Sequence, residues 1–246
     1  MKGKLAEWVC RRAVTDMPGK MSLKSRVILR LSLGLISFAA LLFIPAGSLS
    51  FWQGWALMAL WSVAAIFSFA YFYKHDPQLI ERRLQGKEKV KEQKLLISLA
   101  KPVFLAAFLL PGLDYRFGWS RRSLGAVPLW LILISQALIL AGFLFVIWAM
   151  KVNSFASRTI QVEAGQRVVS TGPYRIVRHP LYLGSIVLWL FTPLALGSYV
   201  ALPAFVLLVP FYVFRLLNEE KVLRHELPGY SEYCLRTRFR LVPYVW

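Results

Sequence analysis

The chain has 246 residues, of which 57% are hydrophobic, and its formal net charge is +18 at pH 7. This hydrophobic content exceeds that of ordinary soluble domains, and the apolar runs approach or reach the roughly 20 residues that span a bilayer. The basic residues lie between these runs, without the basic and aromatic pattern of a nucleic-acid-binding segment. The composition therefore predicts an integral membrane protein and argues against a nucleic-acid partner.

The first half of the chain begins with a basic lead and two apolar spans. Residues 1–26 carry no small-residue cleavage site before the first apolar run, so they predict a cytoplasmic lead to a membrane anchor and not a removed signal peptide. The first span covers about 27–44 and ends at the breaker sequence 45–47. The second covers about 51–73, with aromatic residues at both ends, as is typical of membrane interfaces.

The loop 74–94 is highly charged and therefore solvated, and the third span follows at about 95–110. This span is interrupted by Lys101 and Pro102. Two interpretations of the lysine stay open: a kinked helix whose lysine extends toward the interface or neighbouring helices, or a functional charge. A turn is predicted to begin at residues 111–112, because Pro-Gly is a strong helix breaker.

The second half begins with the clearest apolar span, about 128–150, and a polar stretch at 151–180 follows. An apolar hairpin comes next, with arms at about 181–191 and 199–217 and a turn at 192–198. The first arm is short for a full crossing, so a tilted or partly re-entrant segment is possible. The pattern predicts an all-α membrane bundle with five to six apolar segments.

Basic residues alternate with apolar spans along the chain. Four segments hold 26 of the 30 lysines and arginines: 1–30, 74–94, 151–180 and 215–246. Cytoplasmic loops carry such an excess of basic residues. Both termini and the 151–180 segment are therefore predicted to be cytoplasmic.

Cysteine and histidine residues indicate no metal centre. Cys10 and Cys234 provide no disulfide framework. His75, His179 and His225 are scattered, and none falls in a ligand pattern with cysteines or carboxylates. No metal is therefore predicted.

The segment 172–184 concentrates arginines, a histidine, tyrosines and prolines between two apolar stretches, which is costly at a membrane edge unless it holds a charged group. Pro180 suits the first turn of a helix, which makes His179 the residue that precedes that helix. A helix N-terminus with Arg178 beside it would attract a carboxylate or phosphate. The alternative is a basic residue that faces lipid head groups.

A second polar group follows the apolar hairpin. The carboxylates of Glu219 and Glu220 could accept hydrogen bonds from hydroxyls or neutralise a cation, or Glu220 could simply pair with Arg224 one turn later. Arg215 lies one turn before Glu219 on the same helical face and closer to the membrane. It could hold an acidic substrate group, or it could only mark the membrane boundary.

These residues resemble the isoprenylcysteine carboxyl methyltransferase family, bacterial type, which belongs to a wider group with the phospholipid N-methyltransferases. The resemblance covers about residues 150–246 and rests on Gln161, Gly172-x-Tyr174, Arg178-His179-Pro180-x-Tyr182-x-Gly184, Arg215-x-x-x-Glu219-Glu220, Gly229-Tyr230-x-x-Tyr233 and Arg240-x-x-Pro243. The apolar pattern gives a lead at 1–26 and a four-span membrane region at 27–150. The resemblance implies an S-adenosylmethionine-binding catalytic region at 151–246.

The resemblance also implies roles for single residues. Those expected to bind S-adenosylmethionine are Gln161, Gln166, Arg167, Val168, Val169, Tyr174, Arg178, His179, Pro180, Leu181, Tyr182 and Glu219. Arg215 is expected to meet the methyl acceptor, and Glu220 is the candidate base if that acceptor is an amine. The implied reaction is methyl transfer to a lipid-like or prenylcysteine-like acceptor in a membrane, most simply the bacterial inner membrane, with O-methylation of a carboxylate favoured.

Two other functions stay open. Sterol reductases, which bind a nicotinamide cofactor, share a related arginine-histidine-proline pattern, although they are longer and have an arginine–aspartate–glutamate sequence where Glu219 and Glu220 stand here. A membrane protein without catalytic activity is the other. The acceptor itself is also open, among small thiols, fatty acids, phosphatidylethanolamine and prenylcysteine.

Overall fold

The computed structural model describes residues 21–84, 91–156 and 159–246. These residues form helices and connecting segments without a strand: α2 (Leu23–Ala46), α3 (Trp52–His75), α4 (Pro77–Leu84), α5 (Lys91–Phe117), α6 (Trp119–Ser123), α7 (Leu129–Val152), the 3-10 helix η1 (Gly172–Arg175), α8 (Pro180–Ala195), α9 (Leu202–Val206), α10 (Leu208–Glu226) and α11 (Tyr230–Arg236). The all-α membrane bundle is confirmed. The lead, up to residue 20, and part of the predicted 74–94 loop lie outside the described residues.

Five helical segments are long and apolar enough to cross a membrane: α2, α3, α5, α7 and the continuous stretch Leu202–Glu226 that contains α9 and α10. The protein is therefore an integral, multi-pass membrane protein. Helix α8 has 16 residues, which gives about 24 Å at 1.5 Å per residue. This is less than the roughly 30 Å of a bilayer's hydrocarbon core.

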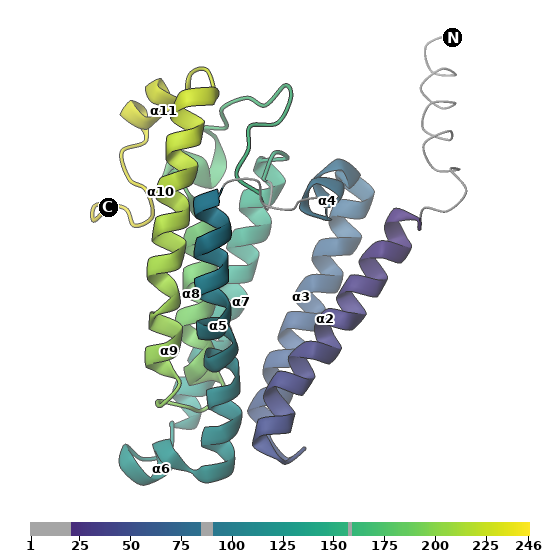
Figure 1. Ribbon diagram of the computed structural model, residues 1–246, viewed down its shortest axis with the longest axis vertical. Helices are drawn as coiled ribbons and strands as arrows, with labels where there is room; N and C mark the ends of the chain where they lie inside the picture. The colour runs from purple at the N-terminus through teal and green to yellow at the C-terminus, as the bar shows by residue number, and fades with distance from the viewer. Residues whose placement is uncertain (1–20, 85–90, 157–158) are drawn as a thin grey trace.

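Helices α5, α7, α8 and α10 form the main bundle, and the α2–α3 hairpin diverges from it toward the upper end in Figure 1. The most extensive packing between helices is that of α7 against α8. A Cβ atom added to Gly184 would lie 2.6 Å from Cγ2 of Val146 and 3.1 Å from the carbonyl oxygen of Gly142. The absence of a side chain at Gly184 therefore sets how closely the two helices approach.

The predicted turn at residues 111–112 is wrong, because α5 continues through it to Phe117. Two physical reasons account for this. A membrane offers no water to satisfy a broken backbone, so helices there tolerate proline. A Cβ on Gly112 would lie 2.6 Å from the carbonyl oxygen of Leu42, so this glycine allows α2 and α5 to pack backbone against backbone.

The predicted turn at 192–198 begins later than expected, because α8 includes Thr192 and Pro193 and ends at Ala195. The Thr192 hydroxyl donates to the carbonyl of Leu188 at 2.7 Å inside the helix. Gly197 then adopts a positive φ of 75°, and the chain reverses there.

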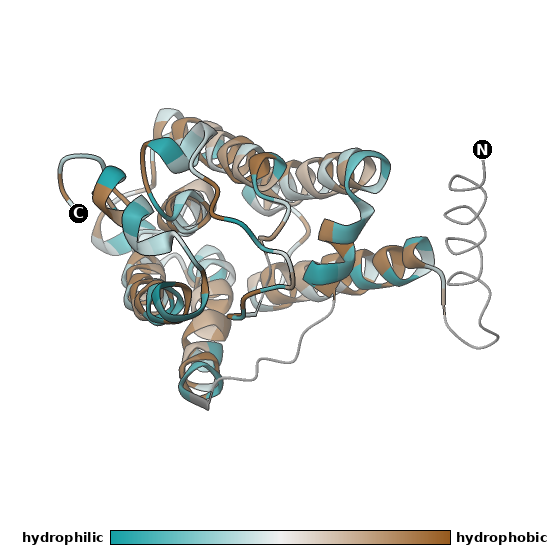
Figure 2. Cartoon of the chain, turned by 90° about the horizontal axis from the view of Figure 1, so that it is seen from above, coloured by the Kyte–Doolittle hydropathy of each residue, from teal (hydrophilic) through white to brown (hydrophobic). Residues whose placement is uncertain are grey.

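Polar residues lie at both ends of the bundle. At the lower end, the buried Asp114 carboxylate accepts hydrogen bonds from the backbone of Ser120 at 2.7 Å and from the hydroxyl of Ser198 at 2.5 Å, which ties α6 to the α8–α9 connection. Seen from above, hydrophilic residues gather on the segments that cover the upper end, while the long helices are mainly hydrophobic (Figure 2). The segments that cover the upper end are therefore mainly hydrophilic.

Candidate functional site

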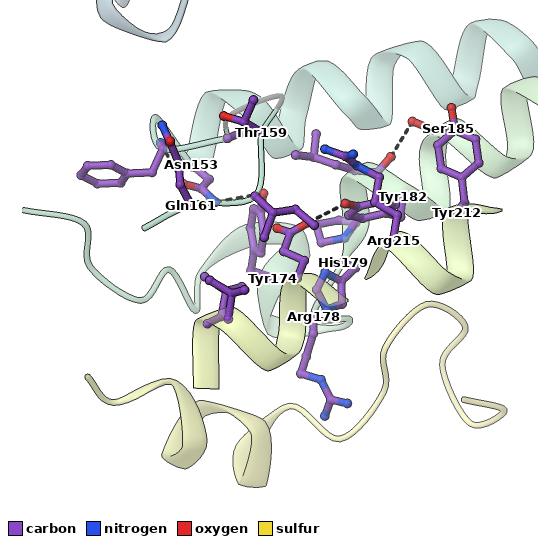
Figure 3. A pocket seen from close by; sticks show the side chains of 18 of the residues that line it. Asn153, Thr159, Gln161, Tyr174, Arg178, His179, Tyr182, Ser185, Tyr212 and Arg215 are labelled. Atoms are coloured by element: carbon purple, nitrogen blue, oxygen red, sulfur yellow. Dashed lines mark hydrogen bonds between the residues drawn. The ribbon is translucent and has the colours of Figure 1, made fainter. Parts of the chain in front are cut away.

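A cavity of about 660 Å³ lies between α5, α8, α10 and the segment that connects α7 to α8. Every residue that was predicted to bind cofactor lines this one cavity, and so does Arg215 (Figure 3). The residues in question are Gln161, Gln166, Arg167, Val168, Val169, Tyr174, Arg178, His179, Pro180, Leu181, Tyr182 and Glu219. Segments separated by more than 50 residues in the sequence thus share one wall.

The start of α8 has the geometry that its sequence predicts. Pro180 is the first residue of the helix and His179 is its N-cap. His179 is 4% exposed, and it lines the cavity at the end of α8 where backbone N–H groups carry partial positive charge. This corner therefore favours a ligand group with negative charge.

Tyrosines and one carboxylate form the polar end of the cavity. The Tyr182 hydroxyl donates to Oε2 of Glu219 at 2.5 Å. The Tyr174 hydroxyl accepts from Nδ2 of Asn153 at 3.2 Å, and burial raises the pKa of Tyr174 above its usual range. Tyr174 therefore stays neutral at physiological pH and can offer a hydroxyl and an aromatic face to a ligand.

Hydrogen bonds from side chains within the segment before η1 hold that segment in its conformation. Nε2 of Gln161 donates to Oε1 of Glu163 at 2.7 Å, and the backbone N–H of Glu163 donates to Oε1 of Gln166 at 2.9 Å. The oxygen of Gln166 is thus used to shape the loop, while both glutamines line the cavity.

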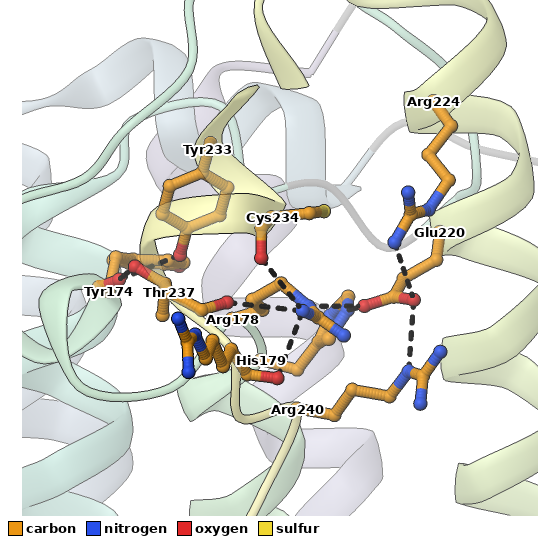
Figure 4. Close-up of polar contacts among 10 residues, drawn as sticks. Tyr174, Arg178, His179, Glu220, Arg224, Tyr233, Cys234, Thr237 and Arg240 are labelled. Atoms are coloured by element: carbon orange, nitrogen blue, oxygen red, sulfur yellow. Dashed lines mark hydrogen bonds and ion pairs between the residues drawn. The ribbon is translucent and has the colours of Figure 1, made fainter. Parts of the chain in front are cut away.

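Glu220 lies at the centre of a buried ion cluster (Figure 4). Its side chain is 4% exposed, and Oε1 accepts from Nε of Arg178 at 2.7 Å and contacts Nε2 of His179 at 3.2 Å. Oε2 accepts from Nε of Arg240 at 3.0 Å, and Arg224 approaches it to 4.0 Å. One carboxylate is therefore surrounded by several cationic groups.

The structure does not bring Glu220 into the cavity wall. Both of its oxygens are engaged by arginines behind the His179 corner, so the carboxylate is poorly placed to take a proton from an acceptor. These contacts favour a structural role for Glu220, and its role as the base for an amine acceptor stays a prediction. The alternative pairing with Arg224 is present at 4.0 Å.

Arg178 also ties the C-terminal segment to the cavity. Its Nη1 donates to the carbonyls of Thr237 and Arg238, each at 3.1 Å, and its backbone N–H donates to the carbonyl of Phe239 at 2.9 Å. The guanidinium is thus used mainly to hold the chain after α11 in place, although Arg178 lines the cavity as well.

The other end of the cavity is mainly apolar and was not predicted. It extends along one face of α5 and one face of α10, with walls that include Leu96, Ala100, Lys101, Phe104, Leu208 and Phe211. Arg215 stands between the polar and apolar ends, and its Nη1 donates to Oε1 of the buried Gln93 at 3.3 Å. The apolar residues of α5 recur at helical spacing in the sequence, and this pattern could have indicated a cavity wall. The same pattern also occurs on a helix that faces lipid, so it does not distinguish the two.

Tyr230 and Arg83 are among the wall residues that were not predicted to bind a ligand. Tyr230 is 5% exposed and lines the cavity, and its hydroxyl has no hydrogen-bond partner among the described residues. Arg83 of α4 reaches the cavity and donates to the carbonyl of Ala156 at 3.1 Å. The motif that contains Gly229 and Tyr230 could have indicated Tyr230 as a wall residue. No feature of the sequence indicated that α4, which carries Arg83, lies beside the cavity.

Residues 130–227 match the phospholipid methyltransferase family model. A 94-residue segment is 33% identical to the Delta(14)-sterol reductase TM7SF2 of Mus musculus, and it covers 36% of this chain and 22% of the reductase. The chain thus spans about a fifth of that relative's length. The region that contains α7, α8, α10 and most of the polar wall of the cavity is therefore similar to the phospholipid methyltransferases.

Proposed function

We propose that the protein is a membrane-embedded, S-adenosylmethionine-dependent methyltransferase of the isoprenylcysteine carboxyl methyltransferase type, with a lipid-like or prenylcysteine-like acceptor. The observation that carries this proposal is the two-ended cavity. Its polar end offers charges of both signs and aromatic faces, and its apolar end continues between α5 and α10 within the membrane-spanning region. The family match over residues 130–227 supports the same activity.

The residues of the polar end fit S-adenosylmethionine, which carries a sulfonium, an ammonium and a carboxylate. Glu219 suits a cationic group, while the His179 corner and Arg167 suit the carboxylate. The rings of Tyr174 and Tyr182 can attract the sulfonium. The volume of about 660 Å³ lies within the range of small-molecule and cofactor sites, about 300–1,000 Å³. When bound, the cofactor supplies an electrophilic methyl group.

The charges on the cavity wall favour a carboxylate as the methyl acceptor. Glu219 is the single carboxylate among the described lining residues, whereas Arg83, Lys101, Arg167 and Arg215 line the same cavity. A carboxylate acceptor needs no general base, which agrees with the engagement of Glu220 elsewhere. The protein's contribution is then alignment of the acceptor and exclusion of water.

The test is isothermal titration of the detergent-solubilised protein with S-adenosylmethionine and with NADPH. Saturable binding of S-adenosylmethionine alone supports the proposal. The second candidate is an NADPH-dependent reductase, which the partial similarity to a sterol reductase favours. Binding of NADPH without S-adenosylmethionine would replace the proposal by this candidate, and binding of neither would indicate a non-catalytic membrane protein.

We also propose that the cavity opens on the cytoplasmic side of a bacterial inner membrane, because basic residues collect in the segments at that end. Reporter domains fused after Leu84 and after Trp246 should both give a cytoplasmic signal, and a reporter inserted after Ser48 should give a periplasmic one. A periplasmic signal at Leu84 or Trp246 would contradict this orientation.

Replacing Tyr230 with phenylalanine should weaken S-adenosylmethionine binding without destabilising the protein. The Tyr230 hydroxyl is buried and has no hydrogen-bond partner among the residues that the structure describes, so removing it relieves a desolvation cost in the free protein. A hydrogen bond from it to the cofactor would contribute about 0.5–1.5 kcal/mol, which is roughly two- to tenfold in affinity. Titration calorimetry and thermal unfolding measure the two effects, and equal affinity in variant and parent would remove Tyr230 from the cofactor site.

Replacing Arg215 with lysine should leave cofactor affinity intact and lower kcat/KM for the acceptor tenfold or more. Arg215 stands where the polar and apolar ends of the cavity meet, and its planar guanidinium can hold a carboxylate at two points that lysine cannot copy. The lost contact is worth about 1.5–3 kcal/mol. Methyl transfer to an acceptor with a measurable rate gives kcat/KM, and an unchanged value would make Arg215 a residue that only marks the membrane boundary.

A further inference from the structure

Lys101 is a basic residue well inside a membrane-spanning helix. It lies in the Glu92–Phe117 span of α5, seven residues beyond Lys94, which places it about 10 Å deeper at 1.5 Å per residue. A charge at that depth is costly, and such residues usually face a polar cavity and serve a function. The sequence left open whether Lys101 is functional, and its depth in the membrane-spanning helix favours a functional role.

The surroundings of Lys101 are the apolar end of the cavity. Leu96, Ala100 and Phe104 share its helical face, and all of them line the cavity with it. Among the described residues, Glu81 and Glu220 form ion pairs with basic residues, and none of these pairs includes Lys101. The ammonium group thus adds a positive charge to a mainly apolar wall, without an ion pair to a carboxylate in the part of the chain that the structure describes.

Lys101 and Arg215 come from two antiparallel helices. Helix α5 runs from the upper end of the bundle to the lower end, and α10 runs the opposite way (Figure 1). Side chains on a helix tilt toward its N-terminus. Arg215 contacts Gln93, which lies eight residues before Lys101 on α5. The Lys101 side chain therefore extends toward the level of Arg215, and both residues line the same cavity.

We propose that Lys101, together with Arg215, binds an anionic group on the head of an amphiphilic acceptor, and that the apolar chain of this acceptor lies along the α5–α10 face. This inference rests on the proposed function where it names the ligand an acceptor. The anion is either the carboxylate that is methylated or a phosphate beside the methylated group. Both present the same chemistry to two cations, and the experiment separates them.

The experiment measures binding of radiolabelled probes to the protein in nanodiscs of phosphatidylcholine, with empty nanodiscs as background. Four probes share a chain of about 16 carbons and differ in the head: hexadecanoate, hexadecyl phosphate, hexadecanamide and hexadecylamine. At least one of the two anionic probes should bind the parent protein more tightly than the amide or the amine. K101Q should weaken the binding of that probe about ten- to hundredfold, as expected for a lost charge-assisted hydrogen bond, and K101R should restore most of it.

The matched control is K94Q, because Lys94 is an exposed lysine of the same helix outside the cavity, and this variant should bind all probes like the parent. If hexadecanoate depends on Lys101, the bound anion is a carboxylate, and if only hexadecyl phosphate does, it is a phosphate. Unchanged anion binding in K101Q, or tightest binding of the amine, would overturn the inference. Titration of the same samples with S-adenosylmethionine tests the proposed function separately, because K101Q should leave cofactor affinity unchanged.

Discussion

Replacing Glu220 with alanine is expected to lower the free energy of unfolding by about 3–5 kcal/mol. The Glu220 carboxylate is buried and holds Arg178 at 2.7 Å and Arg240 at 3.0 Å, with His179 at 3.2 Å. Without it, the buried Arg178 guanidinium keeps its carbonyl partners but loses the opposite charge. An uncompensated buried charge is among the most destabilising changes a single substitution can make.

The measurement is the free energy of unfolding in mixed detergent micelles, followed by the helical circular dichroism signal. The control is Glu226→Ala, because Glu226 lies on the same helix and is exposed. This variant should unfold within about 0.5 kcal/mol of the parent. A Glu220→Ala variant as stable as the parent would contradict the structural role of the cluster.

Replacing Glu219 with glutamine is expected to weaken S-adenosylmethionine binding about ten- to hundredfold, while the protein stays folded. Glu219 lines the cavity and accepts a hydrogen bond from Tyr182, which a glutamine oxygen could still accept. The variant therefore loses the negative charge and little packing. A lost charge-assisted hydrogen bond to the cofactor corresponds to about 1.5–3 kcal/mol.

Titration calorimetry gives the affinity, and thermal unfolding confirms the fold. Glu232→Gln is the control, because Glu232 is exposed on α11 and does not line the cavity. His179→Ala should likewise weaken cofactor binding, but it should also lower stability, since His179 contacts Glu220 as well as the cavity. Parent-like binding by Glu219→Gln would show that this carboxylate does not serve the cofactor.

The sequence predicted the membrane helices well because their formation depends on local composition. An apolar run long enough to cross a bilayer must satisfy its own backbone, and a helix is the way to do so. The start of α8 was equally predictable, because Pro180 has no backbone N–H and suits a first helical turn. The residues of the polar end were predicted through the resemblance, and most of them lie in motifs of fixed order and spacing.

Long-range packing corrected the local signals. Pro111 and Gly112 predict a turn by themselves, but Gly112 lies against the backbone of α2 and stays helical. The apolar end of the cavity was hidden for a related reason, because a face of α5 that lines a cavity has the same composition as one that faces lipid. Only the position of α10 opposite α5 distinguishes the two.

The pair Glu219 and Glu220 shows where the sequence reaches its limit. The sequence by itself determined that two carboxylates follow the last apolar span and that an arginine, Arg215, lies one turn before them. Consecutive residues of an α-helix point about 100° apart, so the order of the two residues does not by itself decide which of them faces the cavity. The tertiary structure decided which one: the arginines that pack behind the His179 corner enclose Glu220, and Glu219 is left facing the cavity, because the cations that surround a side chain come from segments distant in sequence.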